Sequence, residues 1–248
     1  MPLKVVVLGG TKGMGRAVAR RLAARGDHVH LLGRDPEELA RCAADLQARM
    51  PTPSPVTYSI CDLERPGMFA SSVADASTAL GGFDTFVITA ALFATQARLE
   101  TDRDFTQRLL TANFAHTVLL CEHVRDYLLA RGGGTLCVFS SVAGDRARKP
   151  VVLYGATKAG LSAYLEGLDY KFRSAGLRTI CVKPGFVRTA MTDGLPEPPF
   201  ATGPENVAAT VVRAIDRGTP IVYAPAIWAL VMLAIRWLPR SLMRRIGF

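Results

Sequence analysis

The sequence lacks the cysteine patterns of disulfide-rich domains and of zinc sites. Its 248 residues include five cysteines, and none of them forms a C-x-x-C pair or has the spacing of zinc ligands. They lie in apolar runs, or in one case in a helix-like segment: Cys61, Cys121, Cys137, Cys181 and Cys42. Such positions are typical of reduced core residues, which favours a cytosolic compartment. We therefore expect no disulfide and no metal site.

Membrane-spanning segments and nucleic-acid-binding motifs are also missing. The apolar run at residues 224–235 is about 12 residues long, whereas a spanning helix needs about 20. A strand-like run begins at residue 4, so we expect no signal peptide. No zinc finger, RNA-recognition aromatic motif or long Lys/Arg run is present, and we expect no binding to nucleic acid.

Acidic residues are few beside the basic ones, 21 against 30, which gives a formal net charge of +9 and a pI of about 9.7. This balance favours anionic partners such as nucleotide phosphates, anionic lipid or an acidic substrate. The tail at residues 224–248 combines apolar residues with tryptophans and arginines, namely Trp228, Trp237, Arg236, Arg240, Arg244 and Arg245. This composition suits a helix lying on a membrane surface. A tail packed on the core or on a second subunit is the alternative.

The residues that are present predict one large α/β domain. Hydrophobic residues make up 49% of the chain, enough for a sizeable core. Strands are expected at residues 3–8, 29–32, 56–60, 83–89, 135–139, 178–182 and 220–223. Helices are expected at 13–25, 35–50, 152–175 and 203–216, between the strands at 56–60 and 83–89, and over 102–131, where one break stays open, with a turn at 51–55. Such alternation indicates a parallel sheet with helices on both faces. The domain is expected over residues 1–223, followed by the tail.

The first expected strand runs into a glycine-rich turn, LGGTKGMGRA, that opens a helix. Gly9, Gly13 and Gly15 permit a tight turn and the close approach of a pyrophosphate to the backbone. The helix N-terminus adds free N–H groups and the positive end of its dipole. We predict dinucleotide binding by this loop, which also contains Thr11, Lys12 and Met14. A purely structural turn is the alternative.

The second expected strand ends in LLGRD, where an NAD enzyme usually places a carboxylate for the ribose 2′-hydroxyl. Here Gly33 is small, Arg34 is cationic, and Lys12 adds a second cation. Two cations near one ribose suit a 2′-phosphate, so NADP(H) is favoured over NAD(H). Asp35 is expected to cap the next helix. Two solvated surface charges are the alternative.

The stretch YGATK places a phenol and an ammonium four residues apart, at Tyr154 and Lys158. On a helix these positions share a face. A nearby cation favours phenolate and lowers the pKa of a tyrosine from about 10 toward neutrality, which makes it a general acid at pH 7. Taken alone, two side chains that merely share a helix are the alternative.

Further motifs stand in register with this pair. The sequence Ser140-Ser141-Val-Ala-Gly144 follows one expected strand and Pro184-Gly185 follows another. The pattern resembles the short-chain dehydrogenase/reductase family, in its single-domain branch, over nearly the whole chain. The resemblance implies a doubly wound Rossmann fold with a seven-stranded parallel sheet. It also implies a catalytic tetrad at Asn113, Ser141, Tyr154 and Lys158.

The resemblance implies hydride transfer between a nicotinamide cofactor and a ketone or secondary alcohol. Tyr154 would protonate the developing alkoxide, and Ser141 would donate a hydrogen bond to the same oxygen. Lys158 would lower the pKa of the tyrosine and bind the nicotinamide-ribose hydroxyls. Asn113 would hold a water in a proton relay, or would only hydrogen-bond within its helix.

Other cofactor contacts follow from the same resemblance. Asp62, with Leu63 beside it, corresponds to the residue that meets the adenine. Ile88-Thr89-Ala90-Ala91 stands where the family often has N-N-A-G, so Ala90 and Ala91 keep the backbone approach but the asparagine that usually steadies the strand is absent. The pair expected to hold the carboxamide and the phosphates follows Pro184 and Gly185, at Val187 and Thr189.

Two segments bear on the substrate. The loop GDRARKP carries Arg146, Arg148 and Lys149 between two tetrad residues, where they would rim the site and attract a phosphate or carboxylate. Solvated charges on an exposed turn are the alternative. Residues 190–202 lie where the family keeps a mobile lid, and their apolar members would cover an apolar ligand: Met191, Leu195 and Phe200.

Three segments look like the decaprenylphosphoryl-2-keto-ribose reductase subgroup: SSVAGDRARKPVVLYGATKAGL, KPGFVRTAMT and the tail. This resemblance implies a lipid-linked keto sugar as substrate. Lys12 and Arg34 depart from the cofactor-site pattern of that subgroup. Three other substrates stay open. They are a 3-keto lipid (for example a keto-sphingoid base), a 3-ketoacyl thioester and a soluble ketone. A catalytically silent NADP-binding scaffold or redox sensor stays open as a function of another class. The family resemblance implies a homodimer or homotetramer, and the subgroup a cytoplasmic protein peripheral at the inner membrane face.

Overall fold

Seven parallel strands form one sheet in the computed structural model, which describes residues 1–51 and 55–246. Their order across the sheet is β3-β2-β1-β4-β5-β6-β7. The strands are β1 (Lys4–Leu8), β2 (His28–Gly33), β3 (Thr57–Ile60), β4 (Thr85–Ile88), β5 (Gly134–Phe139), β6 (Leu177–Pro184) and β7 (Ile221–Ala224). The expected doubly wound α/β fold is confirmed.

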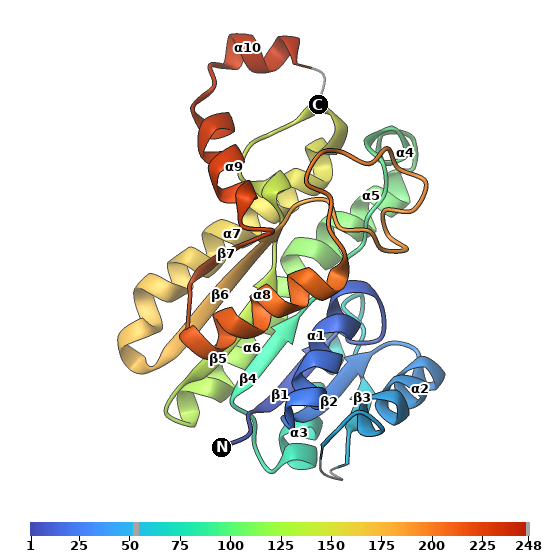
Figure 1. The fold of residues 1–248 in the computed structure, drawn as a ribbon, viewed down its shortest axis with the longest axis vertical. Coiled ribbons are helices and arrows are strands. Elements are labelled where there is room, and N and C mark those ends of the chain that lie inside the picture. The colour runs from blue at the N-terminus through green and yellow to red at the C-terminus, as the bar shows by residue number, and fades with distance from the viewer. Residues whose placement is uncertain (52–54, 247–248) are drawn as a thin grey trace.

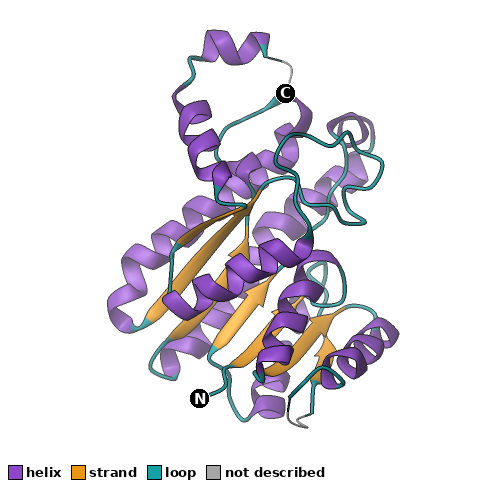
Figure 2. Ribbon diagram, in the orientation of Figure 1, coloured by secondary structure: helices purple, strands orange, loops and turns teal. Residues whose placement is uncertain are grey.

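Helices cover both faces of the sheet (Figure 2). They are α1 (Gly13–Arg25), α2 (Pro36–Gln47), α3 (Phe69–Leu80), α4 (Gln96–Thr101), α5 (Arg103–Leu110), α6 (Thr117–Ala130), α7 (Val152–Phe172), α8 (Pro204–Arg217), α9 (Ile227–Trp237) and α10 (Arg240–Arg245). The expected α1 is confirmed to its bounds. The Asp35 cap is confirmed too, since its carboxylate accepts the N–H groups of Glu37 and Glu38 at 3.1 Å.

Two apolar layers sandwich the sheet, and β1 shows how one strand serves both. Val5 and Val7 pack in the core formed with α1, α2 and α8, whereas Val6 and Leu8 pack in the core formed with α3, α6 and α7. Alternate side chains of a strand point to opposite faces, so a continuous run of apolar residues is buried on both. The strand order reverses between β1 and β4, and ligands of such folds bind at the carboxyl ends of these strands.

The expected helical region over residues 102–131 is interrupted, an outcome that the sequence left open. Its middle, Thr111–His116, is wound as a π-helix between α5 and α6, and α4 precedes them as a separate short helix. A π-helical turn inserts an extra residue into the helical repeat and is often found at functional sites. Periodicity alone did not reveal this turn because it changes the helix by a single residue.

The tail forms α9 and α10 beyond the carboxyl end of the sheet, at the top of Figure 1. One face of α9 packs on the core through Trp228 and Met232, which contact Val142. The opposite face leaves Leu230 and Leu233 exposed. Packing on the core is therefore observed for one side of the tail. The last two residues, 247–248, lie outside the described part of the chain. Most of the turn expected at 51–55 also lies outside it.

None of the helices in residues 1–51 and 55–246 combines the length and the apolar character needed to cross a bilayer.

Candidate active site

Tyr154 and Lys158 lie one turn apart on α7, as their spacing predicts. Lys158 is 3% exposed, and its Nζ donates a hydrogen bond to the main-chain oxygen of Phe139 at 2.8 Å. The same Nζ lies 5.7 Å from the centroid of the Tyr154 ring. The ammonium thus lies between the end of β5 and Tyr154. It faces the plane of the phenol ring, and its hydrogen bond goes to the Phe139 oxygen.

Ser141 begins the 3-10 turn Val142–Gly144 that follows β5, and its Oγ accepts the N–H of Ala143 at 3.1 Å. Its side chain also interacts with the Tyr154 phenol and lowers the pKa of that phenol. Two glycines allow this turn to lie against α7. A Cβ on Gly144 would be 2.6 Å from the Lys158 carbonyl carbon, and a Cβ on Gly155 would be 2.8 Å from the Ala143 oxygen. The close contact brings Ser141 to Tyr154.

The electrostatics of the pair differ from the sequence-based expectation. Burial raises the pKa of Tyr154 to about 12, and its interaction with Ser141 offsets only part of that rise. Burial likewise lowers the pKa of Lys158 to about 8. The predicted fall of the tyrosine pKa toward neutrality is not found, because loss of solvent disfavours phenolate and the ammonium is directed at Phe139. At neutral pH Tyr154 therefore keeps its proton.

Asn113 lies buried in the π-helical turn. Its Oδ1 accepts the N–H of Leu92 and its Nδ2 donates to the oxygen of the same residue, both at 2.7 Å. The side-chain amide thereby anchors the segment after β4, and it keeps one further acceptor site on its oxygen and one further N–H donor. The water-holding role of Asn113 stays a prediction.

The glycine loop packs against the end of β4. A Cβ on Gly15 would lie 2.2 Å from the Gly9 oxygen, and one on Gly9 would lie 2.6 Å from the Thr89 Oγ1. Thr89 donates from its hydroxyl to the Leu8 oxygen at 3.0 Å. This threonine ties β4 to β1 where the family often has an asparagine. The local sequence did not single it out, because its partner lies 81 positions away.

A cavity of about 190 Å³ opens beside this loop, at the carboxyl ends of β1, β2 and β3. Seven of the expected cofactor residues line it: Gly9, Thr11, Arg34, Asp62, Leu63, Ala90 and Ala91. Asp62 Oδ1 accepts the N–H of Glu64 at 3.0 Å, which shapes the turn after β3. Lys12, Gly13, Met14 and Gly15 form the start of α1 next to this cavity, with Lys12 exposed.

The remaining expected cofactor residues follow β6. A Cβ on Gly13 would contact the Thr189 methyl at 3.4 Å, so the glycine loop and the segment after β6 lie together. Val187 is buried and pairs with Thr202 at the base of residues 188–201. Pro184 ends β6, and at Gly185 a Cβ would meet the Trp228 Nε1 at 1.9 Å. Trp228 thus takes the space that a side chain at position 185 would need.

The basic loop after Ser141 is held by the tail. Arg146 donates to the Leu238 oxygen at the end of α9, and Lys149 donates to the Arg244 oxygen in α10, both at 2.7 Å. Helix carboxyl ends attract cations because their last carbonyls lack helical partners. Each side chain keeps further N–H donors, and the rim for an anionic substrate stays a prediction. Arg148 is largely desolvated, which lowers its pKa.

Sequence reasoning missed a buried cluster beside Ser141. Lys183 Nζ pairs with Asp145 Oδ1 at 2.5 Å, and the Tyr223 hydroxyl donates to Asp145 Oδ2 at 2.7 Å. The cluster ties the turn after β5 to β6 and β7. Phe93 was missed too, and its ring meets the Tyr154 ring edge-on at 5.2 Å. The signal was present only as a lone acid in GDRARKP and a lysine in KPG.

Comparisons with known proteins agree with this geometry. A family model described as short chain dehydrogenase matches residues 4–199. An uncharacterized oxidoreductase of Mycobacterium tuberculosis is 36% identical over 245 residues, which cover 97% of this chain and 96% of that protein. Carbonyl reductase family member 4 of Xenopus tropicalis is 27% identical over 218 residues, 85% of this chain and 89% of that protein.

The fold is similar to that of solved structures. A short-chain type dehydrogenase/reductase from Mycobacterium ulcerans aligns with a TM-score of 0.81 at 22% identity, and the alignment covers 88% of this chain and 86% of that one. At this identity the likeness concerns the fold. The shared architecture includes the sheet whose carboxyl end carries the residues described above.

Proposed function

Because the chain belongs to the short-chain dehydrogenase family, we propose that it is an NADP(H)-dependent oxidoreductase acting on a ketone or secondary alcohol. The observation that carries this proposal is the packing of the Ser141 turn against α7, which carries Tyr154 one helical turn from the buried Lys158 ammonium. The relative named carbonyl reductase family member 4 supports the same reaction class.

The residues present fit a dinucleotide. The backbone approach of Gly9 to Gly15 and Thr89 leaves no room for a Cβ, so the loop presents main chain to its surroundings. The first N–H groups of α1 have no helical partners and are suited to a pyrophosphate. Asp62 and Arg34 line the adjoining cavity and would hold the adenosine half. When bound, the nicotinamide supplies or accepts a hydride.

The chain itself handles the proton. Tyr154 holds its proton at neutral pH and would donate it to the substrate oxygen as negative charge develops there. The Ser141 hydroxyl would donate a second hydrogen bond to that oxygen. The Lys158 ammonium, buried under the ring, stabilises the phenolate that is left. This distribution favours reduction of a ketone at pH 7.

The preference for NADP(H) is supported by Arg34. Its side chain is 66% exposed at the end of β2 and lines the cavity next to Asp62. No carboxylate precedes it on the strand, and Asp35 is occupied with the cap of α2. A guanidinium in this place suits a 2′-phosphate.

For the substrate we favour a ketone carried on a lipid, such as a polyprenyl-phosphate keto sugar, with a 3-keto lipid as the rival. Residues 190–202 and the tail expose several apolar side chains, namely Met191, Phe200, Leu230 and Leu233. Phe200 and Trp228 meet edge-on at 6.3 Å, so these two segments adjoin. Such a surface suits an amphiphilic substrate better than a small polar one.

The tail also supports a peripheral contact with anionic membranes. Residues 224–248 hold Arg236, Arg240, Arg244 and Arg245 and no acidic residue, and Trp237 is 82% exposed. Such a helix binds an anionic surface through apolar and electrostatic contacts together. Co-sedimentation with phosphatidylglycerol vesicles is expected to fall in Trp237→Ala. An equally exposed aromatic residue on α7 provides the control, Tyr170→Ala, which is expected to bind as the wild type does.

A homodimer or homotetramer is proposed as the assembly. Leu119 of α6 is exposed on a helix that covers the sheet. Light scattering coupled to size-exclusion chromatography would measure the mass, and a monomer at micromolar concentration would contradict this assignment.

The decisive experiment follows NADPH and NADH consumption with four ketones. They are a polyprenyl-phosphate keto sugar, a 3-keto sphingoid base, a 3-ketoacyl thioester and a soluble diketone. Tyr154→Phe is the control, because it removes the proton donor and keeps the ring. Turnover with NADPH that is lost in this variant supports the proposal. Tight cofactor binding with no turnover of any ketone, and unchanged complementation by Tyr154→Phe, would favour a scaffold or sensor.

A further inference from the structure

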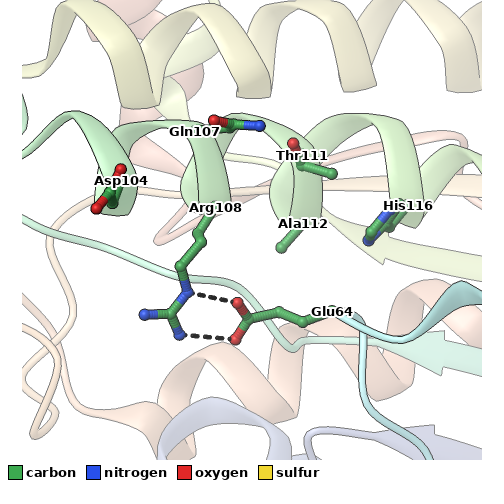
Figure 3. Close-up of a pocket in the computed structure, with 7 residues that line it drawn as sticks. All are labelled: Glu64, Asp104, Gln107, Arg108, Thr111, Ala112 and His116. Carbon is green, nitrogen blue, oxygen red and sulfur yellow. Dashed lines mark hydrogen bonds and ion pairs between the residues drawn. The ribbon is translucent and has the colours of Figure 1, made fainter.

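Glu64 lies where two cavities meet at the adenine end of the site. It lines the 190 Å³ cavity together with Arg34 and Asp62, and also a neighbouring cavity of about 320 Å³. In Figure 3 its carboxylate faces the guanidinium of Arg108, which comes from α5. The two groups form a forked pair, with Arg108 Nε 2.6 Å from Oε1 and a terminal nitrogen 3.0 Å from Oε2.

Arg34 approaches the same carboxylate more loosely. Its nearest nitrogen is 3.8 Å from Glu64 Oε2, outside hydrogen-bond range, and most of its side chain is exposed. Glu64 is ionised, since its hydrogen bonds with Arg108 hold its pKa below the usual value. Both carboxylate oxygens are thus engaged by Arg108, and the guanidinium of Arg34 keeps its donors for another partner.

Arg34, Arg108 and Glu64 are the charged side chains in contact or near contact here, and the carboxylates of Asp62 and Asp104 also line the two cavities. Arg34, Arg108 and Glu64 together carry one net positive charge, and the forked pair neutralises the only anion among the three. Without the charge of Arg108, the net charge of these three positions would fall from +1 to zero. The Glu64 carboxylate could then pair with Arg34. A carboxylate in that position repels a phosphate and competes with it for the guanidinium.

We propose that Arg108 is a positioning residue for cofactor selectivity: by clamping Glu64, it reserves Arg34 for the 2′-phosphate of NADP(H). The inference rests on the proposed NADP(H) preference. It assigns a role to a residue on α5 that lies 44 positions from its partner.

Two adenine nucleotides test this without catalysis. Adenosine 2′,5′-bisphosphate and 5′-AMP differ only in the 2′-phosphate, and isothermal titration calorimetry gives the affinity of each. The variants are Arg108→Gln, Arg108→Lys, Glu64→Gln and the double variant Arg108→Gln/Glu64→Gln. Arg103→Gln is the matched control, because Arg103 lies on the same helix and outside the Glu64 cluster. Thermal melts report whether each variant is folded.

Arg108→Gln is expected to weaken binding of the bisphosphate about tenfold and to leave 5′-AMP unchanged. Arg108→Lys, which keeps the charge but not the fork, is expected to lie between this variant and the wild type. The double variant is expected to recover wild-type affinity, because the freed carboxylate is gone. That recovery is a result which a merely structural role of Arg108 does not produce.

Two failures can be told apart. A wild-type protein that binds both nucleotides equally would overturn the NADP(H) preference and the inference with it. A wild-type protein that prefers the bisphosphate, with an Arg108→Gln variant that loses both ligands alike or is not rescued by Glu64→Gln, would overturn the inference alone.

Discussion

The buried ammonium of Lys158 donates its hydrogen bond to the main-chain oxygen of Phe139, at 2.8 Å. This contact joins the first catalytic helix turn to the end of β5, directly before Ser140 and Ser141. Burial of this charge has a cost that can be measured.

Lys158→Met is expected to abolish activity and to stabilise the protein. Burial lowers the lysine pKa from 10.5 to about 8, so the unfolded chain binds the proton more tightly than the folded one. The wild-type free energy of unfolding therefore rises between pH 8 and pH 10.5. At pH 7 the variant is expected to gain about 1–2 kcal/mol, after loss of the Phe139 bond is counted. Urea unfolding at pH 7 and pH 10 measures this, and a gain that grows with pH would contradict it.

Ketone reduction is expected to be insensitive to pH below 8 and to decline above it. Tyr154 keeps its proton up to about pH 12, whereas Lys158 loses its charge above about pH 8. Once the ammonium is neutral, the phenolate left by proton transfer is no longer stabilised, and kcat should fall by about tenfold per pH unit. Steady-state rates from pH 6 to pH 10 test this. Activity that climbs from pH 8 to pH 10 would mean that deprotonated Tyr154 is required.

Gly155→Ala is expected to lower both stability and kcat. The new Cβ would lie 2.8 Å from the Ala143 oxygen, so the turn that carries Ser141 must move, at a cost of about 1–3 kcal/mol. Gly167→Ala on the same helix is the control, since no atom lies within 4 Å of its Cβ. That variant is expected to gain about 0.5–1 kcal/mol with unchanged kcat. Equal effects of the two substitutions would show that close packing at Gly155 is unimportant.

Asn113→Ala is expected to destabilise the protein by about 1–3 kcal/mol, because the Leu92 N–H and oxygen lose their partners in a buried place. The chain contains one other asparagine, Asn206, which is exposed on α8 and donates to Thr202. Asn206→Ala is expected to cost under about 1 kcal/mol. Chemical denaturation of both variants makes the comparison, and a smaller loss for Asn113→Ala would remove its anchoring role.

The two tryptophans of the tail are expected to behave oppositely. Trp228 is 8% exposed and fills the space over Gly185, so Trp228→Ala should cost about 3–5 kcal/mol and disturb cofactor binding. Trp237 is 82% exposed, and Trp237→Ala should leave the free energy of unfolding within about 0.5 kcal/mol of the wild type. If both variants unfold alike, the packing of α9 on the site is not what holds the tail.

Much of the fold was predictable from local patterns. The apolar strands, the helix at residues 13–25 and the cap at Asp35 each depend on neighbours within a few positions, and all three are confirmed. The cofactor loop and the Tyr154–Lys158 pair were recognisable for the same reason. The π-helical turn around Asn113 was not, because a one-residue insertion hardly changes the hydrophobic period.

The sequence by itself determined the fold class, the glycine loop and the spacing of Tyr154 and Lys158, since each rests on short-range geometry. Only the tertiary structure decided the charge state and the partners of these groups. Burial, which raises the pKa of Tyr154, depends on what packs around the ring. Arg146 reaches the end of α9 across 92 positions, and Glu64 meets Arg108 across 44. Such contacts depend on how distant segments fold together, and no local pattern records them.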